Sequence, residues 1–305
     1  MISIVIPVFN EGAPLIELCH RILRIVSSLS DCEIILVDDR SKDNSWQIMR
    51  DLARDNQQIK IARLCRNFGQ HSALTAGLSL AKGKYIVMMD CDGQDAPESI
   101  PLLYETILTK DVQVVYAKRK NRKDGWFKST ASKFMNAILQ WLSGMKHDPE
   151  IGTFRIMKRF VADTYLAMPE RNRFIGGMFY WLNFESATVD VPHHNRKTGK
   201  SNYTFVKLIK LARLGVLSSS TKILSVGTYL GLVSSILSIG IGIYYLVLKF
   251  FFNVPLGFTA IIVSIFFVGS IIMLLLGIIG EYLREIFEEV KARPNFIIEE
   301  TINFD

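Results

Sequence analysis

Two carboxylates and an amide occur at alternate positions directly after an apolar run in the first third of the chain. The run is Tyr85–Met89, and the polar residues are Asp90, Asp92 and Gln94. Carboxylate and amide oxygens are hard ligands that suit Mg²⁺ or Mn²⁺. If the run is a buried parallel strand, these residues lie at its carboxyl end, where α/β sheets bind nucleotides. The spacing therefore indicates a divalent cation that holds a diphosphate, and the alternative interpretation is an acidic turn that ends a strand.

Polar residues also follow the other apolar runs of strand length. Asn10 and Glu11 come after the first run, and the adjacent carboxylates Asp38 and Asp39 end the second, where they could accept hydrogen bonds from a base or ribose. The segment 66–71 closes the third run with an arginine and a glycine, which suit a close approach to a diphosphate. Each group is a weak signal alone, but four successive strand ends of this kind indicate a nucleotide site.

The elements that must position these residues follow an alternating pattern. Apolar runs alternate with amphipathic helical stretches, which is typical of an open, mostly parallel α/β sheet. Strands are expected at Ile2–Pro7, Glu33–Val37, Ile59–Leu64, Tyr85–Met89 and Val112–Tyr116. Helices are expected from Ala13 onward, at Asp43–Ala53 and at Gln70–Ala81. We therefore expect the polar strand ends to gather at one edge of a single sheet.

The composition changes beyond residue 220. No charged residue occurs from Ile223 through Leu248, or from Phe250 through Gly280. A transmembrane helix needs ~20 predominantly apolar residues, so two spans are predicted, at about 224–248 and 257–280. Basic residues flank the outer ends of the pair, whereas the connecting loop offers only Lys249. The positive-inside rule then places both termini and the large N-terminal domain in the cytoplasm.

Charge and cysteine usage narrow the function classes. The net charge is +7, but much of it lies near the membrane-proximal segments, which favours anionic lipid or phosphate over nucleic acid as the partner. Two basic amphipathic stretches, about 126–143 and 204–222, are typical of helices on the bilayer surface, or alternatively of helices that pack inside the domain. The four cysteines form no Cys-x-x-Cys pair and suit a reducing compartment.

These motifs together resemble family 2 glycosyltransferases of the GT-A type, in the polyprenyl-phosphate branch. That branch includes the bactoprenol glucosyltransferases, the undecaprenyl-phosphate formamido-arabinose transferase and dolichol-phosphate mannose synthase. The resemblance covers nearly the whole chain, including the two apolar segments. The residues that carry it are Pro7–Glu11, Val37–Asp39, Arg66–Ala73, Asp90–Glu98, Asn121–Lys128, Arg196–Tyr203, Gly280–Leu283 and Ala292–Pro294.

The resemblance implies a role for each matching residue. The metal, Mg²⁺ or Mn²⁺, would be held by Asp90, Asp92 and Gln94. The nucleotide-sugar donor would be bound by Pro7, Phe9, Glu11, Asp38, Asp39, Arg66, Asp90, Cys91 and Lys200. The groups expected to take part in catalysis are Asp92, Arg119 and Arg196. The acceptor phosphate would be contacted by Arg122, Lys128 and Arg155.

Two positions depart from the pattern of the resembled family. Many relatives have Asp, proposed as a base or acceptor-positioning group, where this chain has Thr153. Lys usually stands at the position of Asn202, and Lys200 could substitute for it. The first departure leaves the general base unassigned. A phosphate acceptor with a second pKa of about 6 is largely a dianion at neutral pH, however, and it needs positioning more than deprotonation.

We expect a Rossmann-like GT-A domain at 1–203, a juxtamembrane helix at 204–222, two membrane helices within 223–280 and a cytoplasmic tail at 281–305. The predicted reaction is metal-dependent, inverting transfer of one sugar from a nucleotide sugar to a polyprenyl phosphate. By resemblance, the donor is a UDP-sugar and the acceptor is undecaprenyl phosphate. The reaction would take place at the inner (cytoplasmic) membrane and serve lipopolysaccharide, O-antigen or other cell-envelope polysaccharide modification.

Two other interpretations stay open at this point. One is a non-catalytic membrane scaffold that binds a nucleotide sugar and regulates a partner flippase, an interpretation that Thr153 alone favours. The other keeps the same fold but transfers the sugar to a glycerolipid. The resemblance also implies a homo-oligomer, such as a tetramer, that assembles through the membrane helices.

Overall fold

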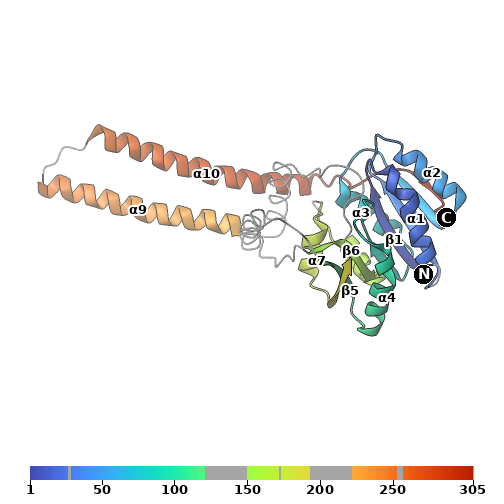
Figure 1. The fold of residues 1–305 in the computed structure, drawn as a ribbon. Coiled ribbons are helices and arrows are strands. Elements are labelled where there is room, and N and C mark those ends of the chain that lie inside the picture. Colours follow the sequence, from blue (N-terminus) through green and yellow to red (C-terminus); the bar gives the residue numbers. More distant parts are fainter. Residues whose placement is uncertain (27–28, 121–149, 172, 193–221, 253–256, 305) are drawn as a thin grey trace.

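A mixed sheet of eight strands forms the centre of the N-terminal domain (Figure 1). The computed structural model describes residues 1–26, 29–120, 150–171, 173–192, 222–252 and 257–304. The strands lie in the order β7-β5-β6-β4-β1-β2-β3-β8. Their bounds are β1 Ile2–Val8, β2 Cys32–Asp38, β3 Ile59–Leu64, β4 Tyr85–Met88, β5 Val114–Lys120, β6 Ile151–Lys158, β7 Ser186–Pro192 and β8 Ile298–Ile302.

The first four strands are parallel and form the half of the sheet that ends in the predicted nucleotide-binding residues. β1 pairs with β2 and β4, and β2 pairs with β3, all in parallel register. β6 lies antiparallel between β4 and β5, and β8 lies antiparallel beside β3 at the opposite edge. The expected α/β architecture is therefore confirmed, and the sheet is mixed where we expected a mostly parallel one.

Helices cover both faces of the sheet, because the side chains of each strand alternate between two hydrophobic clusters. Along β1, Ile4 and Ile6 face the cluster formed with α1, α2 and α4, whereas Val5 faces the cluster formed with α3, α6 and α7. The helices are α1 Gly12–Val26, α2 Ser45–Asp55, α3 Gln70–Leu80, α4 Ile100–Thr109, α6 Arg159–Ala167 and α7 Ile175–Leu182, with a short 3₁₀ turn, η1, at Pro97–Ser99.

Two long helices extend away from this domain side by side (Figure 1). They are α9 Lys222–Phe252 and α10 Phe258–Val290, and each contains a stretch long and apolar enough to cross a membrane, at Gly227–Tyr244 and Phe267–Val290. Their large apolar side chains are mostly exposed, for example Tyr229 and Met273. A soluble core helix would bury such side chains, so these helices indicate membrane association.

The C-terminal segment differs from the expected tail. α10 continues to Val290, ten residues past the expected end of the span at 280, and the chain then returns to the catalytic sheet as β8. Charged residues such as Glu281 and Arg284 sit within this extension and form an ion pair one turn apart. The two expected interfacial helices, at about 126–143 and 204–222, lie outside the described residues.

Candidate active site

The acidic turn after β4 is held by hydrogen bonds from three directions. Gln70, the first residue of α3, donates from Nε2 to Asp90 Oδ1 at 2.6 Å. The backbone N–H of Asp90 donates to Asp95 Oδ2 at 3.3 Å, and the backbone N–H of Gln94 donates to Asp92 Oδ1 at 3.0 Å. Gly93 provides the positive φ of 74° that lets the chain fold back between them. The turn therefore presents Asp90 and Asp92 together, as the spacing predicts.

A buried ion pair joins the acidic turn to the neighbouring strand β5. Arg119 on β5 donates from Nη2 to Asp95 Oδ1 at 3.0 Å, and the Asp95 side chain is 1% exposed. Gly152 on β6 lies directly against the guanidinium, since a Cβ at this glycine would come within 2.8 Å of Arg119 Nη2. Arg119, one of the groups expected to take part in catalysis, is thus joined to the acidic turn through Asp95, and its side chain is 24% exposed.

The turn concentrates negative charge. Burial raises the pKa of Asp90 to about 7, and the neighbouring carboxylates of Asp95 and Asp92 add to the rise. Arg119 and a hydrogen bond from the Thr153 side chain act in the opposite direction. An ionised Asp90 is therefore disfavoured unless further positive charge is supplied.

The donor set fits a divalent cation that is shared with a phosphate ligand. Among the described residues, no group of three His, Cys, Asp or Glu side chains could hold a metal. Mg²⁺ is commonly bound by one or two carboxylates together with substrate phosphates. Asp90 and Asp92 supply that number of carboxylates, and the raised pKa of Asp90 marks the uncompensated charge that such a cation would neutralise.

Asp39 holds the turn between β3 and α3. Its carboxylate accepts the backbone N–H of Phe68 at 2.7 Å and of Gly69 at 2.8 Å, and Asn67 Nδ2 donates to its carbonyl oxygen at 3.2 Å. Gly69 has a φ of 95° and ψ of 158°, a region that is essentially restricted to glycine. The predicted base- or ribose-binding carboxylate thus shapes the neighbouring loop.

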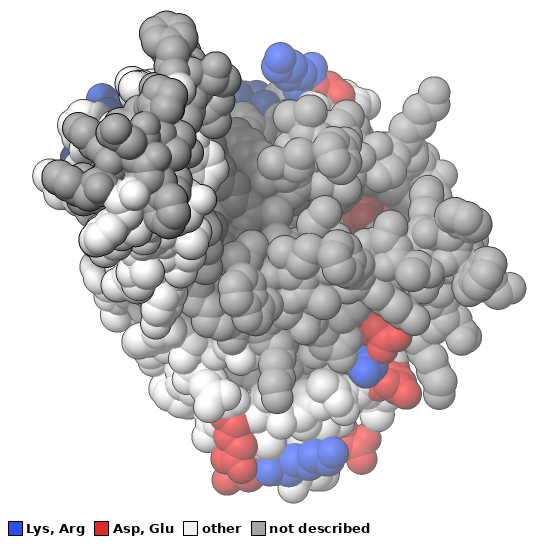
Figure 2. Space-filling model, turned by 90° about the vertical axis from the view of Figure 1, so that its left-hand side faces the viewer, with Lys and Arg blue, Asp and Glu red and all other residues white. Residues whose placement is uncertain are grey.

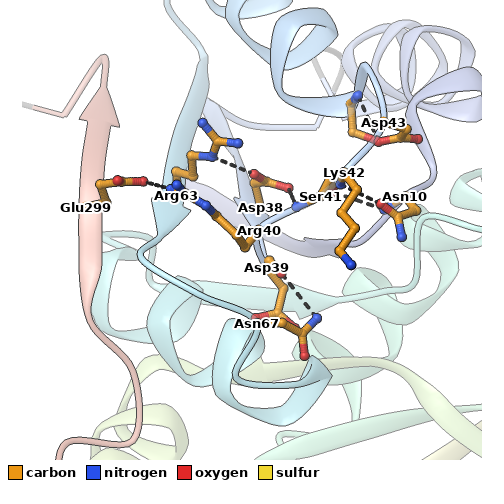
Figure 3. Close-up of polar contacts among 11 residues, drawn as sticks. Asn10, Asp38, Asp39, Arg40, Ser41, Lys42, Asp43, Arg63, Asn67 and Glu299 are labelled. Carbon is orange, nitrogen blue, oxygen red and sulfur yellow. Dashed lines mark hydrogen bonds and ion pairs between the residues drawn. The ribbon is translucent and has the colours of Figure 1, made fainter.

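Asp38 is fully buried and serves the fold (Figure 3). Oδ1 accepts the backbone N–H of Ser41 at 2.9 Å, and Oδ2 accepts Nε of Arg63 at 3.1 Å. The Ser41 hydroxyl in turn accepts the backbone N–H of Asn10 at 2.9 Å. Of the two adjacent carboxylates predicted to meet the nucleotide, Asp38 is therefore a positioning residue that ties the loops after β1 and β2 together.

The loop after β1 meets the acidic turn at Glu11. Cys91 is 5% exposed and donates its thiol to Glu11 Oε2 at 3.1 Å, so it is a buried residue that orients this carboxylate. The side chain of Phe9 is 43% exposed and available for stacking, whereas Pro7 lies in the buried strand β1. Arg66 lies over the ring of Phe68, 4.5 Å from its centroid.

Arg155 was predicted to contact the acceptor phosphate, and the structure places it in the interior. The residue is 4% exposed, and its guanidinium lies between the rings of Tyr116 and Phe179 at 5.0 and 4.9 Å. It donates to the carbonyl oxygens of Thr153 and Gly152 at 3.1 and 2.9 Å. Arg155 therefore stabilises the backbone of β6 near the acidic turn, and its buried positive charge interacts with Asp90.

Residues 3–166 match the sequence pattern of the family described as "Glycosyl transferase family 2". The chain belongs to this family. The matched region includes β1–β6 and every described residue of the acidic turn, so this family 2 protein is a glycosyltransferase.

The similarity to curated relatives extends over the two apolar helices of this chain. The glycosyltransferase is 33% identical to the undecaprenyl-phosphate 4-deoxy-4-formamido-L-arabinose transferase of Proteus mirabilis, over 99% of this chain and 94% of the relative. It is 34% identical to the bactoprenol glucosyl transferase of Shigella phage SfII, over 98% of both chains. An uncharacterized glycosyltransferase of Synechocystis is 37% identical over 97% of this chain and 94% of the relative.

The fold of the domain recurs in solved structures of more distant enzymes. Mannosyl-3-phosphoglycerate synthase from Rubrobacter xylanophilus matches with a TM-score of 0.54 at 14% identity, covering 75% of each chain. A complex of glucosyl-3-phosphoglycerate synthase from Mycobacterium tuberculosis with Mn²⁺, UDP-glucose and phosphoglyceric acid matches with a TM-score of 0.50 at 19% identity, covering 71% of this chain and 77% of that one. At these identities the likeness establishes the fold alone.

Several predicted residues of this glycosyltransferase lie outside the described part of the chain. They are Arg122 and Lys128, expected at the acceptor phosphate, Arg196, expected to take part in catalysis, and Lys200, expected to bind the donor. Their roles stay predictions.

His71 is a residue of the site region to which the motif analysis assigned no role. It follows Gln70 at the start of α3, and its Nδ1 is buried with no hydrogen-bond partner among the described residues. Its ring and that of Phe174 lie edge to face, with their centroids 5.5 Å apart. Burial, with a further contribution from Arg155, lowers the pKa of His71 to about 4. The imidazole is therefore neutral at physiological pH. The sequence feature that could have identified His71 is its position between Gln70 and the largely small side chains of α3, which predicts burial.

Proposed function

We propose that this glycosyltransferase moves one sugar from a UDP-sugar to undecaprenyl phosphate at the cytoplasmic leaflet of the membrane. The observation that carries the proposal is similarity over nearly the whole chain to two transferases whose names specify undecaprenyl phosphate or bactoprenol. Because the similarity extends through both apolar helices, it includes the part of the chain that would meet a lipid. The more distant solved neighbours lend only their fold.

Exposed aromatic side chains support a lipid acceptor. Figure 2 shows the protein from the end at which the two helices extend, with described acidic and basic side chains next to one another at its lower edge. The exposed aromatic residues Tyr180 and Trp181 on α7 are of the type that anchors proteins at membrane interfaces. A domain that such residues hold at the membrane interface could reach a phosphate at the level of the lipid headgroups while the polyprenyl tail stays in the bilayer.

Asp90 and Asp92 would hold Mg²⁺ or Mn²⁺ against the donor diphosphate. The cation would supply positive charge to the diphosphate as it leaves. Arg119, pinned by Asp95, places a further positive charge at the same turn. Charge that is already in position when the leaving group develops its own charge stabilises the transition state.

The acceptor needs little activation from the protein. An oxygen of the phosphate monoester would attack the anomeric carbon of the sugar, and the bond from that carbon to the nucleoside diphosphate would break with inversion. Most of the phosphate is already a dianion at neutral pH, since its second pKa is about 6. Thr153, which stands where many relatives have a carboxylate, is therefore compatible with transfer, and positioning replaces proton abstraction.

A transfer assay tests the proposal. The full-length protein in detergent is incubated with undecaprenyl phosphate, Mn²⁺ or Mg²⁺ and a panel of radiolabelled UDP- and GDP-sugars. We expect an organic-extractable labelled product from a UDP-sugar that disappears with EDTA and in Asp92→Ala. Labelling of added diacylglycerol in preference to undecaprenyl phosphate would replace the proposed acceptor. Labelling from a GDP-sugar would replace the proposed donor.

A further inference from the structure

The segment that follows the membrane helix is part of the catalytic sheet. β8 pairs antiparallel with β3, with Ile302 opposite Ile61 and Glu300 opposite Arg63. Phe296, Ile298 and Phe304 pack against one hydrophobic cluster of the domain, and Ile302 packs against the other. We refer to residues 289–304 as the C-terminal strap, because they join the end of α10 to the far edge of the sheet.

Side-chain and backbone contacts secure the far end of the strap. Asn303 Nδ2 donates to the carbonyl oxygens of Ala53 and Ile59 at 2.7 and 2.8 Å, which joins it to the end of α2 and the start of β3. The backbone N–H of Cys65 donates to the carbonyl oxygen of Ile297 at 3.0 Å. The strap is thus fixed to the strand that leads into the turn at Phe68 and Gly69.

Glu299 reaches from the strap to the loop that precedes α2 (Figure 3). Its carboxylate forms an ion pair with Arg40, the residue directly after Asp39. Arg40 adopts a left-handed backbone conformation with a φ of 62°, which is unfavourable for a residue other than glycine. The ion pair therefore restrains the loop at Arg40. The preceding residue, Asp39, has the carboxylate that accepts the backbone N–H groups of Phe68 and Gly69.

The near end of the strap contacts a second loop beside the site. Glu289, in the last turn of α10, accepts the backbone N–H of Arg171 at 2.8 Å, and Arg171 Nη1 donates to the carbonyl oxygen of Arg293 at 2.9 Å. The loop that contains Arg171 leads to Phe174, whose ring packs on His71. His71 follows Gln70, the residue that donates to Asp90.

We propose that the C-terminal strap positions the donor-binding loops of the active site and that Glu299 is a positioning residue that acts through Arg40. The proposal rests on the proposed function, because it assumes that these loops bind a nucleotide. The strap contacts one loop at Arg40 and another at Arg171. The domain that binds the donor is consequently complete only with residues that lie beyond the membrane helices.

The ion pair is suited to a local effect. The side chains of Arg40 and Glu299 are 40% and 44% exposed, and exposed pairs contribute little to global stability. The loop it restrains connects through Asp39 to two backbone amides at the start of α3. Removing the pair should leave the fold intact and raise the frequency with which these amides open.

Glu300 provides a matched control for Glu299. Both are exposed acidic residues of β8, and neighbouring residues of a strand point to opposite faces. We expect Glu299→Ala to increase hydrogen exchange of the peptide that contains Phe68 and Gly69 by roughly 1.4- to 5-fold, the range of exposed ion pairs. The affinity for UDP in the presence of Mn²⁺, measured by calorimetry, should also fall, by no more than this factor, because it depends on the fraction of molecules whose loop is closed. Glu300→Ala should match the wild type in both measurements.

A double-variant cycle adds a readout specific to the pair. If Glu299 acts through Arg40, Glu299→Ala should have no further effect on exchange or UDP affinity in an Arg40→Ala background. Additive effects would overturn the positioning role, and so would equal behaviour of the two β8 variants. Faster exchange with unchanged UDP affinity would likewise overturn it. If the wild type binds no uridine nucleotide, the proposed donor fails, whereas the exchange comparison still decides whether Glu299 holds the loop.

Discussion

Substitution of Gly152 by alanine should damage the active site through the Arg119–Asp95 pair. A Cβ at this position would lie 2.8, 2.9 and 3.1 Å from Nη2, Cζ and Nε of Arg119. Nonbonded heavy atoms are comfortable at about 3.5 Å or more, so the guanidinium must move by roughly 0.7 Å. Its hydrogen bond to Asp95 Oδ1 is already 3.0 Å long, and a displacement away from that oxygen would break it.

The magnitude follows from the burial of Asp95. A hydrogen bond to a charged group contributes about 1.5–3 kcal/mol, and the side chain of Asp95 is 1% exposed, so water cannot replace Arg119 freely. Asp95 also accepts the backbone N–H of Asp90, so the acidic turn shifts with it. We expect the melting temperature to fall by about 3–12 °C and kcat/KM to fall at least about tenfold, the equivalent of 1.4 kcal/mol.

Gly176→Ala is the matched control. A Cβ at Gly176 would meet only the ring of Phe174, at 3.5 Å, which is an ordinary contact. Both variants are measured as full-length protein in detergent, by thermal unfolding and by the transfer assay. The assay uses the donor and acceptor that the wild-type protein uses. If Gly152→Ala keeps the melting temperature and kcat/KM of Gly176→Ala, Arg119 does not depend on its contact with Asp95 and the reasoning is wrong.

Three further predictions concern other parts of the site. Asp92→Ala should lose Mn²⁺-dependent transfer while it keeps or gains thermal stability, since it removes a charge that raises the pKa of Asp90; Asp55→Ala, at the end of α2, is the control, and loss of the fold would contradict the assignment. Gly69→Ala should destabilise the protein by about 1–3 kcal/mol through backbone strain at a φ of 95°. No atom of the described residues lies within 4 Å of the added methyl group, so a steric clash would not explain the loss. An unchanged melting temperature would refute the strained turn. His71 has a folded pKa of about 4, below its ordinary value of 6.5. The unfolded state therefore binds more protons between these values, and stability should fall by about 3 kcal/mol as the pH drops from 6.5 to 4. His71→Asn should lack this pH dependence in thermal unfolding, and an identical pH profile would refute the neutral, buried imidazole.

The parallel half of the fold could be predicted from local patterns. β3 has the predicted bounds, Ile59–Leu64, and β1 and β2 differ by one residue at their ends. β1 and β2 are buried on both faces and are mostly apolar, a pattern that only a few structures can explain, whereas β3 is interrupted by the partly exposed Lys60 and Arg63. The acidic turn could be placed for the same reason, since Asp90 and Asp92 directly follow such a run.

The remaining strands depend on long-range contacts. In β7, exposed residues alternate with partly or fully buried ones, and β8 has three exposed residues within Ile298–Ile302. Neither segment has an apolar run, and β8 becomes a strand only because the edge of β3 offers unpaired backbone groups. Likewise, no local pattern distinguishes Asp38, whose carboxylate serves Ser41 and Arg63, from the adjacent Asp39.

Thr153 gains a physical interpretation from its position beside the acidic turn. Asp90 is already near the carboxylates of Asp92 and Asp95, which raise its pKa. A carboxylate at residue 153 would add a fourth negative charge, whereas the threonine side chain forms a hydrogen bond that favours the ionised form of Asp90. If Asp90 binds the proposed cation, Thr153 thus favours the form of Asp90 that can act as a ligand near neutral pH. The proposed phosphate acceptor, which is already largely a dianion, would need no base at this position, so the two features are mutually consistent.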